Sequence, residues 1–151
     1  FPAATYKLIG DCSEEGIEIK QYCVDVGLMG SVQFYKETDL EGLLHHARLA
    51  SFYLQASKFE GMAMSVMEAM MMGLVPVVTP VGEIQKYCNK NNSILIHSNL
   101  EAVRSIMQIL KNESSFLCAS NAAVLTWEGQ MYYVDSVSSN CERVLKEEIN
   151  K

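Results

Sequence analysis

The sequence has few basic residues for the number of its acidic ones. Twelve lysines and arginines stand against 18 aspartates and glutamates, which gives a formal net charge of -6. A nucleic-acid-binding domain usually presents a basic face, so this balance argues against a nucleic-acid partner. The sequence also lacks an uncharged apolar run of 18 residues, and therefore predicts no transmembrane segment. Its first residues, F-P-A-A-T-Y, lack the charged and apolar regions of a signal peptide.

The cysteines lack the spacing of a disulfide framework or a zinc site. They are odd in number, scattered along the chain and never arranged as C-x-x-C: Cys12, Cys23, Cys88, Cys118 and Cys141. Small disulfide-rich domains and structural zinc sites need paired or closely spaced cysteines. The pattern therefore predicts reduced, partly buried thiols in a cytoplasmic protein.

What the sequence does contain is an ordinary globular composition. It has 151 residues, of which 49% are hydrophobic and 20% charged, enough for about one domain with a core of its own. We find no internal repeat, low-complexity segment or linker. The chain begins with Phe1 rather than methionine, which predicts a fragment of a longer protein.

Apolar, β-branched runs alternate with segments of helical periodicity. We expect strands at 6–10, 31–35, 51–55, 75–79 and 93–97, and helices at 14–27, 39–47, 82–88, 100–111, 114–122 and 129–148, with a further helix that starts near 62–64. This alternation predicts an α/β protein: a Rossmann-like, three-layer α/β/α fold with a mostly parallel sheet. Ligands of such sheets bind at the carboxyl ends of the strands, where helix N-termini point.

Three helices carry local expectations. Asp39 is a suitable N-cap for the second of them. Apolar residues lie on or near one face of the first, at Ile17, Ile19, Tyr22, Cys23 and Val26. In the third, Met64, Met67 and Met71 fall at helical spacing and are expected to pack inward.

The segment E-G-M-A-M-S-V-M-E places two carboxylates, Glu60 and Glu68, around an apolar stretch. Three explanations are open: helix-end charges that complement the dipole, a metal site, or a pocket for a polar ligand. A pair of glycosidase carboxylates is also conceivable. One acid in a loop that leads into a Rossmann-type helix nevertheless favours contacts with ligand hydroxyls.

The residues between the two acids suit a phosphate group. The loop after the third strand contains Gly61, where the backbone can approach a ligand closely. The amides of Gly61, Met62, Ala63 and Met64 are the unpaired donors of the helix's first turn, and with the helix dipole they can hold a phosphate. A carboxylate only accepts hydrogen bonds, so it suits sugar hydroxyls. The pattern therefore predicts a nucleotide-sugar pocket.

The same residues carry a resemblance to a known family. E-G-M-A-M-S-V-M-E-A-M-M-M-G-L-V-P-V-V-T-P-V-G-E-I resembles the signature of retaining glycosyltransferases of the GT-B fold, and more narrowly of family 4, with two glutamates that have seven residues between them, followed by E-A-M-x-x-G-x-P-V-V. K-L-I-G-D, V-Q-F-Y-K and A-S-F-Y-L-Q-A-S resemble the family's strands in the same order. L-T-W-E-G-Q resembles the start of its closing helix.

The resemblance implies roles for the matching residues. Glu60 is implied as the catalytic position that contacts the donor sugar, and Glu68 as the acceptor for the ribose hydroxyls. The amides of Gly61, Met62, Ala63 and Met64 are implied to hold the diphosphate, and Phe34, Tyr35 and Lys36 to lie near the nucleobase. The donor is a nucleotide-diphosphate sugar, with no cofactor and no required metal. Sugar transfer in this family retains the anomeric configuration.

The resemblance also implies what lies outside this chain. The family's donor domain opens with a strand, a basic pair and a helix, and an acceptor-binding domain precedes it. We therefore expect residues 1–128 to form a nucleotide-sugar-binding domain without its first strand and helix, and 129–151 to form the closing helix. That first strand is expected mid-sheet, between K-L-I-G-D and S-F-Y-L-Q, and the fragment alone is expected to be inactive.

Two departures from the family pattern are Lys36, where glycine is usual, and Met62-Ala63, where an aromatic residue and a glycine are common. A non-catalytic module that binds a nucleotide sugar or another protein remains the alternative function. The resemblance favours polysaccharide biosynthesis, in the cytoplasm or at the inner face of the membrane.

Overall fold

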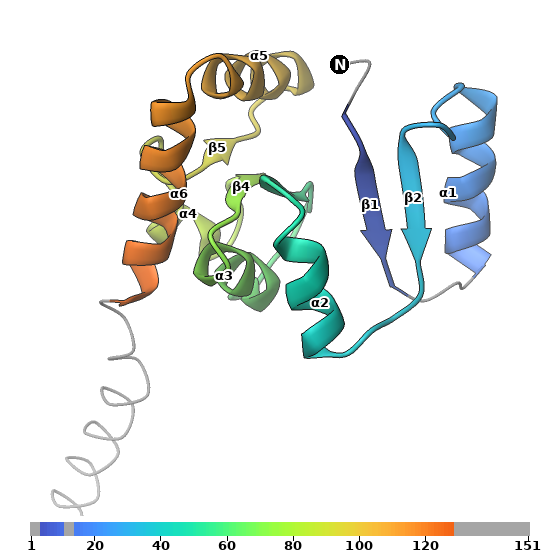
Figure 1. Ribbon diagram of the computed structural model, residues 1–151, viewed down its shortest axis with the longest axis horizontal. Helices are drawn as coiled ribbons and strands as arrows, with labels where there is room; N and C mark the ends of the chain where they lie inside the picture. Colours follow the sequence, from blue (N-terminus) through green and yellow to red (C-terminus); the bar gives the residue numbers. More distant parts are fainter. Residues whose placement is uncertain (1–3, 11–13, 129–151) are drawn as a thin grey trace, which may run out of the picture. The chain divides into compact units, whose positions relative to one another are not determined.

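The computed structural model describes residues 4–10 and 14–128. They belong to two compact units, Phe1–His46 and Ala47–Lys151. The helices and strands of both appear in Figure 1, coloured along the chain. None of the helices in the described ranges has the length and apolarity needed to cross a bilayer.

The first unit is a βαβ arrangement. Strand β1 (Tyr6–Ile9) is followed by helix α1 (Glu14–Asp25) and strand β2 (Val32–Tyr35). The two strands pair in parallel, with Tyr6 opposite Val32 and Ile9 opposite Tyr35. Both strands were expected at these positions, and the parallel pairing confirms the α/β prediction for this part of the chain.

Helix α2 (Leu40–Ala47) begins as expected. The amide of Gly42 donates to Asp39 Oδ1 over 3.0 Å, so Asp39 acts as the N-cap. Of the apolar residues expected on or near one face of α1, only Cys23 is buried. Ile17, Ile19 and Tyr22 of the helix are exposed, as is Val26 just after it. A two-stranded sheet is too narrow to cover a whole helix face.

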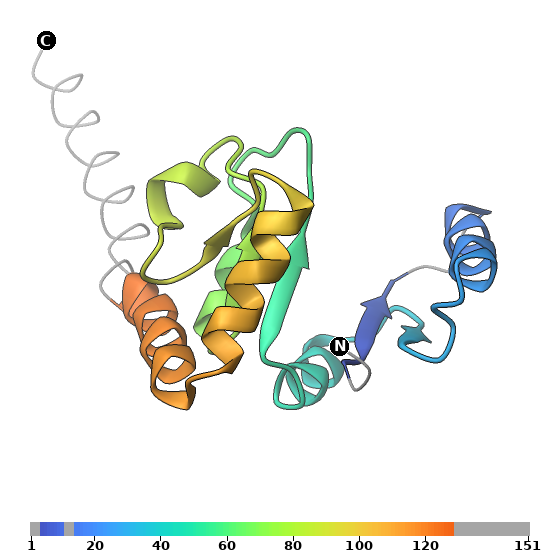
Figure 2. The same cartoon turned by 90° about the horizontal axis from the view of Figure 1, so that it is seen from above.

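The second unit contains a three-stranded parallel sheet. Its strands are β3 (Phe52–Gln55), β4 (Val75–Val78) and β5 (Ile94–Leu95), in the order β3-β4-β5. The helices are α3 (Met64–Met71), α4 (Ile84–Tyr87), α5 (Asn99–Leu110) and α6 (Glu113–Glu128). Helices α5 and α6 meet at a short turn (Figure 2).

Helices cover both faces of this sheet. Val78 packs with α3 and α6 through Val66, Met70 and Ala123, whereas Val77 packs with α5 through Ala102. Consecutive strand residues point to opposite faces, so these are two distinct layers on the central strand. The predicted α/β/α, Rossmann-like organisation is confirmed in this unit.

The C-terminal part of the described chain differs from expectation. A short helix at 114–122 was expected, but α6 runs from Glu113 to Glu128. Trp127 therefore lies in the last turn of α6, not at the start of a separate helix. The reason is its packing, because Ala119, Ala123 and Trp127 recur at four-residue spacing and are all buried. The expected helix at 129–148 lies outside the described residues.

Candidate functional site

The loop between β3 and α3 lies at the carboxyl edge of the second unit's sheet. β3 ends at Gln55 and α3 begins at Met64, as the sequence predicts. Glu60 is half-buried in this loop, and Gly61 is exposed. We call residues 56–63 the acidic loop.

Helix α3 starts with unpaired amides. Ala63, the residue before it, is buried and adopts a left-handed conformation with φ 50° and ψ 60°, and no side chain caps the helix. Within the described residues, the amides of 61–65 donate to no protein acceptor. The four amides expected to be unpaired, those of residues 61–64, are therefore unpaired in the structure, and the amide of Ser65 is a fifth. A helix start of this kind attracts an anion.

The left-handed residue is itself informative. An L-amino acid in this conformation costs about 1–2 kcal/mol, and such residues cluster at binding and catalytic sites. Within the described chain, Ala63 is the one non-glycine residue with positive φ. The turn at Ala63 therefore shapes the start of α3 where the free amides are.

Glu60 is held by the end of β3. Its Oε1 accepts a hydrogen bond from the Gln55 side-chain amide. Gln55 also contacts Ser57, Tyr53 and Ser65 through its side chain. The carboxylate is therefore part of a hydrogen-bonded group and does not simply extend into solvent.

The segment after β4 holds the acidic loop from the other side. The Ser57 amide donates to Thr79 Oγ1 over 3.0 Å, and Thr79 Oγ1 donates back to the Ser57 carbonyl over 2.7 Å. The Glu83 amide donates to the Gly61 carbonyl over 3.1 Å. Both contacts join the carboxyl ends of neighbouring parallel strands.

Gly82 lies directly against the loop. It has φ +56°, and a Cβ placed there would lie 1.9 Å from the Glu60 carbonyl oxygen. Only glycine combines this conformation with this approach. The backbone of the acidic loop is thus fixed by a residue from the next βα connection.

Two tyrosines lie beside the loop. Tyr87 donates its hydroxyl to the Met62 carbonyl over 2.9 Å. Burial raises its pKa, with Cys88 and the charge of Glu60 acting in the same direction. Burial also raises the pKa of Tyr53; Ser65 opposes this shift, while the charges of Glu60 and Glu68 add to it. Both hydroxyls therefore remain protonated donors at neutral pH.

Glu68 is exposed on the second turn of α3. Its charge and that of Glu60 both act on the Tyr53 hydroxyl, so the fold brings the two predicted carboxylates to the same part of the molecule. The methionine prediction is wrong for Met64 and Met71, which are 57% and 60% exposed. The inward face of α3 consists of Val66, Ala69 and Met70, with Met67 half-buried. Val66 and Met70 pack with residues of β4 and α6 in the core of the second unit.

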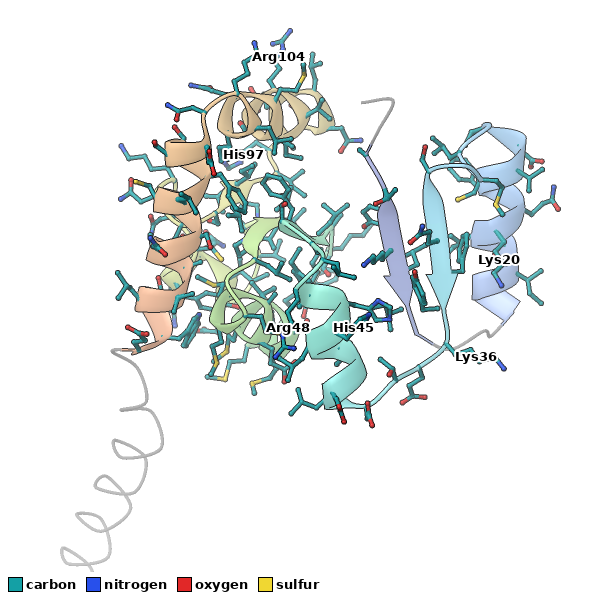
Figure 3. The ribbon with its side chains drawn as sticks, viewed as in Figure 1. Lys20, Lys36, His45, Arg48, His97 and Arg104 are labelled. Atoms are coloured by element: carbon teal, nitrogen blue, oxygen red, sulfur yellow. The ribbon has the colours of Figure 1, made fainter. Side chains whose placement is uncertain are left out.

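The residues predicted near a nucleobase belong to the first unit. Phe34 and Tyr35 are half-buried in β2, with the Lys20 amine 5.2 Å from the centre of the Phe34 ring and the His46 ring 4.3 Å from that of Tyr35. Lys36 is exposed just after β2 (Figure 3). Their role remains a prediction.

Sequence reasoning gave no role to several residues that shape the site: Gln55, Ser65, Thr79, Gly82 and Tyr87. A polar residue at the end of a strand and a T-P-V-G-E stretch after the next strand were visible signals. The contact of Thr79 with Ser57, however, depends on pairing between β3 and β4, and that of Tyr87 with Met62 depends on how α4 packs against the loop. Among the described residues, no group of three or more His, Cys, Asp or Glu side chains is placed to hold a metal ion.

The structure is similar to solved structures of longer proteins. Sucrose-phosphate synthase from Thermosynechococcus elongatus matches with a TM-score of 0.79 and 16% identity, over 95% of this chain and 38% of that protein. HepE from Anabaena matches with a TM-score of 0.77 and 19% identity, over 97% of this chain and 42% of that one. This chain thus spans less than half the length of these two proteins.

The C-terminal domain of LpcC, a group 1 glycosyltransferase from Francisella tularensis, matches with a TM-score of 0.72 and 16% identity, over 87% of this chain and 71% of that one. These likenesses confirm the Rossmann-like α/β fold found in GT-B glycosyltransferases. No curated protein matches the sequence closely enough to count as a relative. Residues 2–112 match the family model described as glycosyl transferases group 1. Because that match covers most of the chain, the protein belongs to the group 1 glycosyltransferase family.

Proposed function

We propose that this chain binds the donor substrate of a retaining glycosyltransferase of family 4. The donor is a nucleotide-diphosphate sugar, whose sugar is transferred to an acceptor hydroxyl. The observation that carries the proposal is the row of unpaired amides at the start of α3, with Glu60 before it and Glu68 after it. HepE, a structural neighbour, has been crystallised with UDP and with UDP-glucose, which supports this ligand class.

Each part of the site has a chemical task in this proposal. The amides of Gly61, Met62, Ala63 and Met64 bind the diphosphate and stabilise the negative charge that develops on it as the leaving group. Glu60 accepts hydrogen bonds from hydroxyls of the donor sugar. Glu68 accepts from the two hydroxyls of the ribose. These side chains orient the donor, so the scissile bond lies over the start of α3.

The diphosphate needs more positive charge than this loop supplies. Lys58 is the one basic residue of the acidic loop, and it is exposed. We propose that a basic pair and an acceptor-binding domain outside this chain complete the enzyme, and that the chain alone does not catalyse transfer. Both solved proteins compared first are more than twice as long as this chain, which supports this view.

A non-catalytic nucleotide-sugar-binding module is the second candidate. The observation that favours it is that the described site contains binding groups but no arginine side chain in the acidic loop. The two candidates differ when the chain is joined to the opening segment of the donor domain, which carries the basic pair, and to an acceptor-binding domain. An enzyme then releases free UDP from UDP-glucose in the presence of acceptor, and a binding module does not.

The proposal is tested by calorimetric titration of the chain with UDP, GDP and ADP and with their glucose conjugates. Glu68→Ala removes two charge-assisted hydrogen bonds to the ribose, and we expect it to weaken binding by about 2–4 kcal/mol. Glu101→Ala is the matched control, because Glu101 is an exposed acid on α5, the helix on the opposite face of the sheet. If the folded chain binds none of these nucleotides, or if both variants bind equally well, the proposal is wrong.

A further inference from the structure

Gln55 is the last residue of β3, and its side chain is half-buried next to the acidic loop. Its Nε2 donates to Glu60 Oε1 and, over 3.3 Å, to Ser57 Oγ. Its Oε1 accepts from the Tyr53 hydroxyl over 3.0 Å and from Ser65 Oγ over 3.1 Å. A primary amide has two donors and two acceptor sites, so the whole hydrogen-bonding capacity of this side chain is used.

The chemistry of the partners fixes which way the amide points. An ionised carboxylate accepts only, so the side of the amide that faces Glu60 must be the nitrogen. On the other side, the Tyr53 hydroxyl stays protonated, because burial raises its pKa, and it donates to the amide oxygen. A hydroxyl can also accept, so it is the Glu60 contact that sets the orientation: a flipped amide would place its oxygen against the carboxylate oxygen, acceptor against acceptor.

The contact leaves part of Glu60 available. Gln55 binds Oε1, and among the described residues Oε2 has no hydrogen-bond partner. An anchored carboxylate with one unoccupied oxygen can accept from a ligand hydroxyl without first losing the rotational freedom of a solvated side chain.

The same amide also reaches the phosphate-binding end of the site. Ser65 lies in the first turn of α3, and its hydroxyl donates to Gln55 Oε1. Gln55 therefore joins the carboxylate in the loop to the helix start whose amides are unpaired. The separation between these two groups is set by one side chain of β3.

We propose that Gln55 is a positioning residue that holds Glu60 in the orientation that binds donor-sugar hydroxyls, at a fixed separation from the amides of α3. The inference rests on the proposed function, because it assigns the support for the sugar half of the same site. Gln55 touches no substrate. It acts through Glu60.

The test compares a ligand with its sugar and a ligand without it. UDP and UDP-glucose are titrated into the 151-residue chain and into Gln55→Met, which keeps the length of the side chain and removes its hydrogen bonds. We expect the affinity for UDP-glucose to fall roughly tenfold, the size of one lost hydrogen bond to a charged group, while the affinity for UDP stays within about twofold. Gln108→Met is the matched control, since Gln108 is exposed on α5.

A double-mutant cycle identifies the route of the effect. In a Glu60→Ala background, Gln55→Met should change the affinity for UDP-glucose by less than about twofold, because the group that Gln55 positions is absent. Trp127 fluorescence on urea unfolding shows that each variant is folded.

The outcomes separate the two proposals. If Gln55→Met lowers the affinities for UDP and UDP-glucose equally, its role is structural and the positioning proposal is wrong. The same conclusion follows if it changes neither affinity, or if its effect persists in the Glu60→Ala background. If the unsubstituted chain binds neither nucleotide nor nucleotide sugar, the proposed function fails, and the positioning proposal fails with it.

Discussion

The two units contain similar elements but differ in what they bury. Among the described residues of the first unit, Cys23 is the one that is buried, whereas the second unit buries residues from β4, β5, α3, α4, α5 and α6. Val66, Ala69, Met70 and Val75 are fully inaccessible to solvent. The difference lies in the number of layers, since the first unit has two strands with one crossover helix and the second has three strands covered on both faces.

This difference shows what positions the candidate site. A two-stranded sheet gains little from burial, so it offers few fixed points from which to hold a functional loop. In the second unit, the acidic loop is anchored to β3, to the segment after β4 and to Tyr87 of α4. The site is therefore built on the part of the described chain that has its own core.

The largest effect is expected for Met70→Ala. Met70 is fully buried, and the Trp127 indole N–H donates to its Sδ over 3.2 Å. Truncation should lower the free energy of unfolding by about 2–5 kcal/mol, through lost apolar burial and the cavity left behind. Urea unfolding followed by the fluorescence of Trp127, the single tryptophan, measures it.

Met71→Ala is the control for this substitution. Met71 is the next residue on α3 but is 60% exposed, so its loss should cost less than about 0.5 kcal/mol. Equal losses for the two variants would contradict the description of the second unit's core.

The next largest effect is expected for Gly82→Ala, which should lower the free energy of unfolding by about 2–3 kcal/mol. The Cβ of the new alanine would collide with the Glu60 carbonyl, and the alanine would have to keep the positive φ of the glycine. Gly61→Ala is the matched control, because a Cβ there has nothing within 4 Å. Thermal unfolding of both variants tests the contact, and a Gly82→Ala chain as stable as the unsubstituted one would rule it out.

Asn92→Ala should lower the free energy of unfolding by a smaller amount, about 1–2 kcal/mol. The buried Asn92 amide donates to the Tyr87 carbonyl and to Thr126 Oγ1, and its Oδ1 accepts from the Asn89 amide. Removing it leaves these partners unsatisfied. Asn91→Ala changes an exposed side chain and should leave the urea midpoint unchanged; similar midpoints for the two variants would count against the buried network.

The smallest effect is expected in the first unit. Ile17 is 64% exposed on α1, so Ile17→Ala should change the free energy of unfolding by less than about 0.5 kcal/mol. Far-UV circular dichroism is the appropriate measurement, because Trp127 reports on the second unit. A loss above about 2 kcal/mol would show that α1 is covered in solution, and the contrast between the units would disappear.

Much of this structure could be predicted from the sequence, because the signals are local. Strand positions followed from β-branched runs, the N-cap from Asp39, and the start of α3 from the glycine after Glu60. The rotation of α3 could not be predicted, since the methionines at 62, 64, 67, 70, 71 and 72 allow several inward faces. The packing of Val66 and Met70 against β4 and α6 selects among them, and the sequence alone does not show which residues α3 meets.

The end of α6 was also misjudged for a physical reason. Trp127 was placed at the start of a new helix by the resemblance of L-T-W-E-G-Q, whereas its packing against Met70 and Tyr87 makes it the last buried position of α6. The support of Glu60 by Gln55 could not be predicted either. It depends on the direction of a side chain at the end of β3, which the residue type alone does not determine.

The contact between the acidic loop and the segment after β4 also bears on how the site forms during folding. Ser57 and Thr79 are 22 positions apart in the chain, so their mutual hydrogen bonds require β3 and β4 to be paired already. A peptide that carries only the acidic loop and α3 would lack Thr79, Gly82 and Glu83, so its loop would lose conformational entropy on closing without the contacts that these residues provide. The candidate site is thus complete only when β3 and β4 have paired, and we expect heat or proteolysis that separates the two strands to abolish the proposed ligand binding in the same step that opens the core.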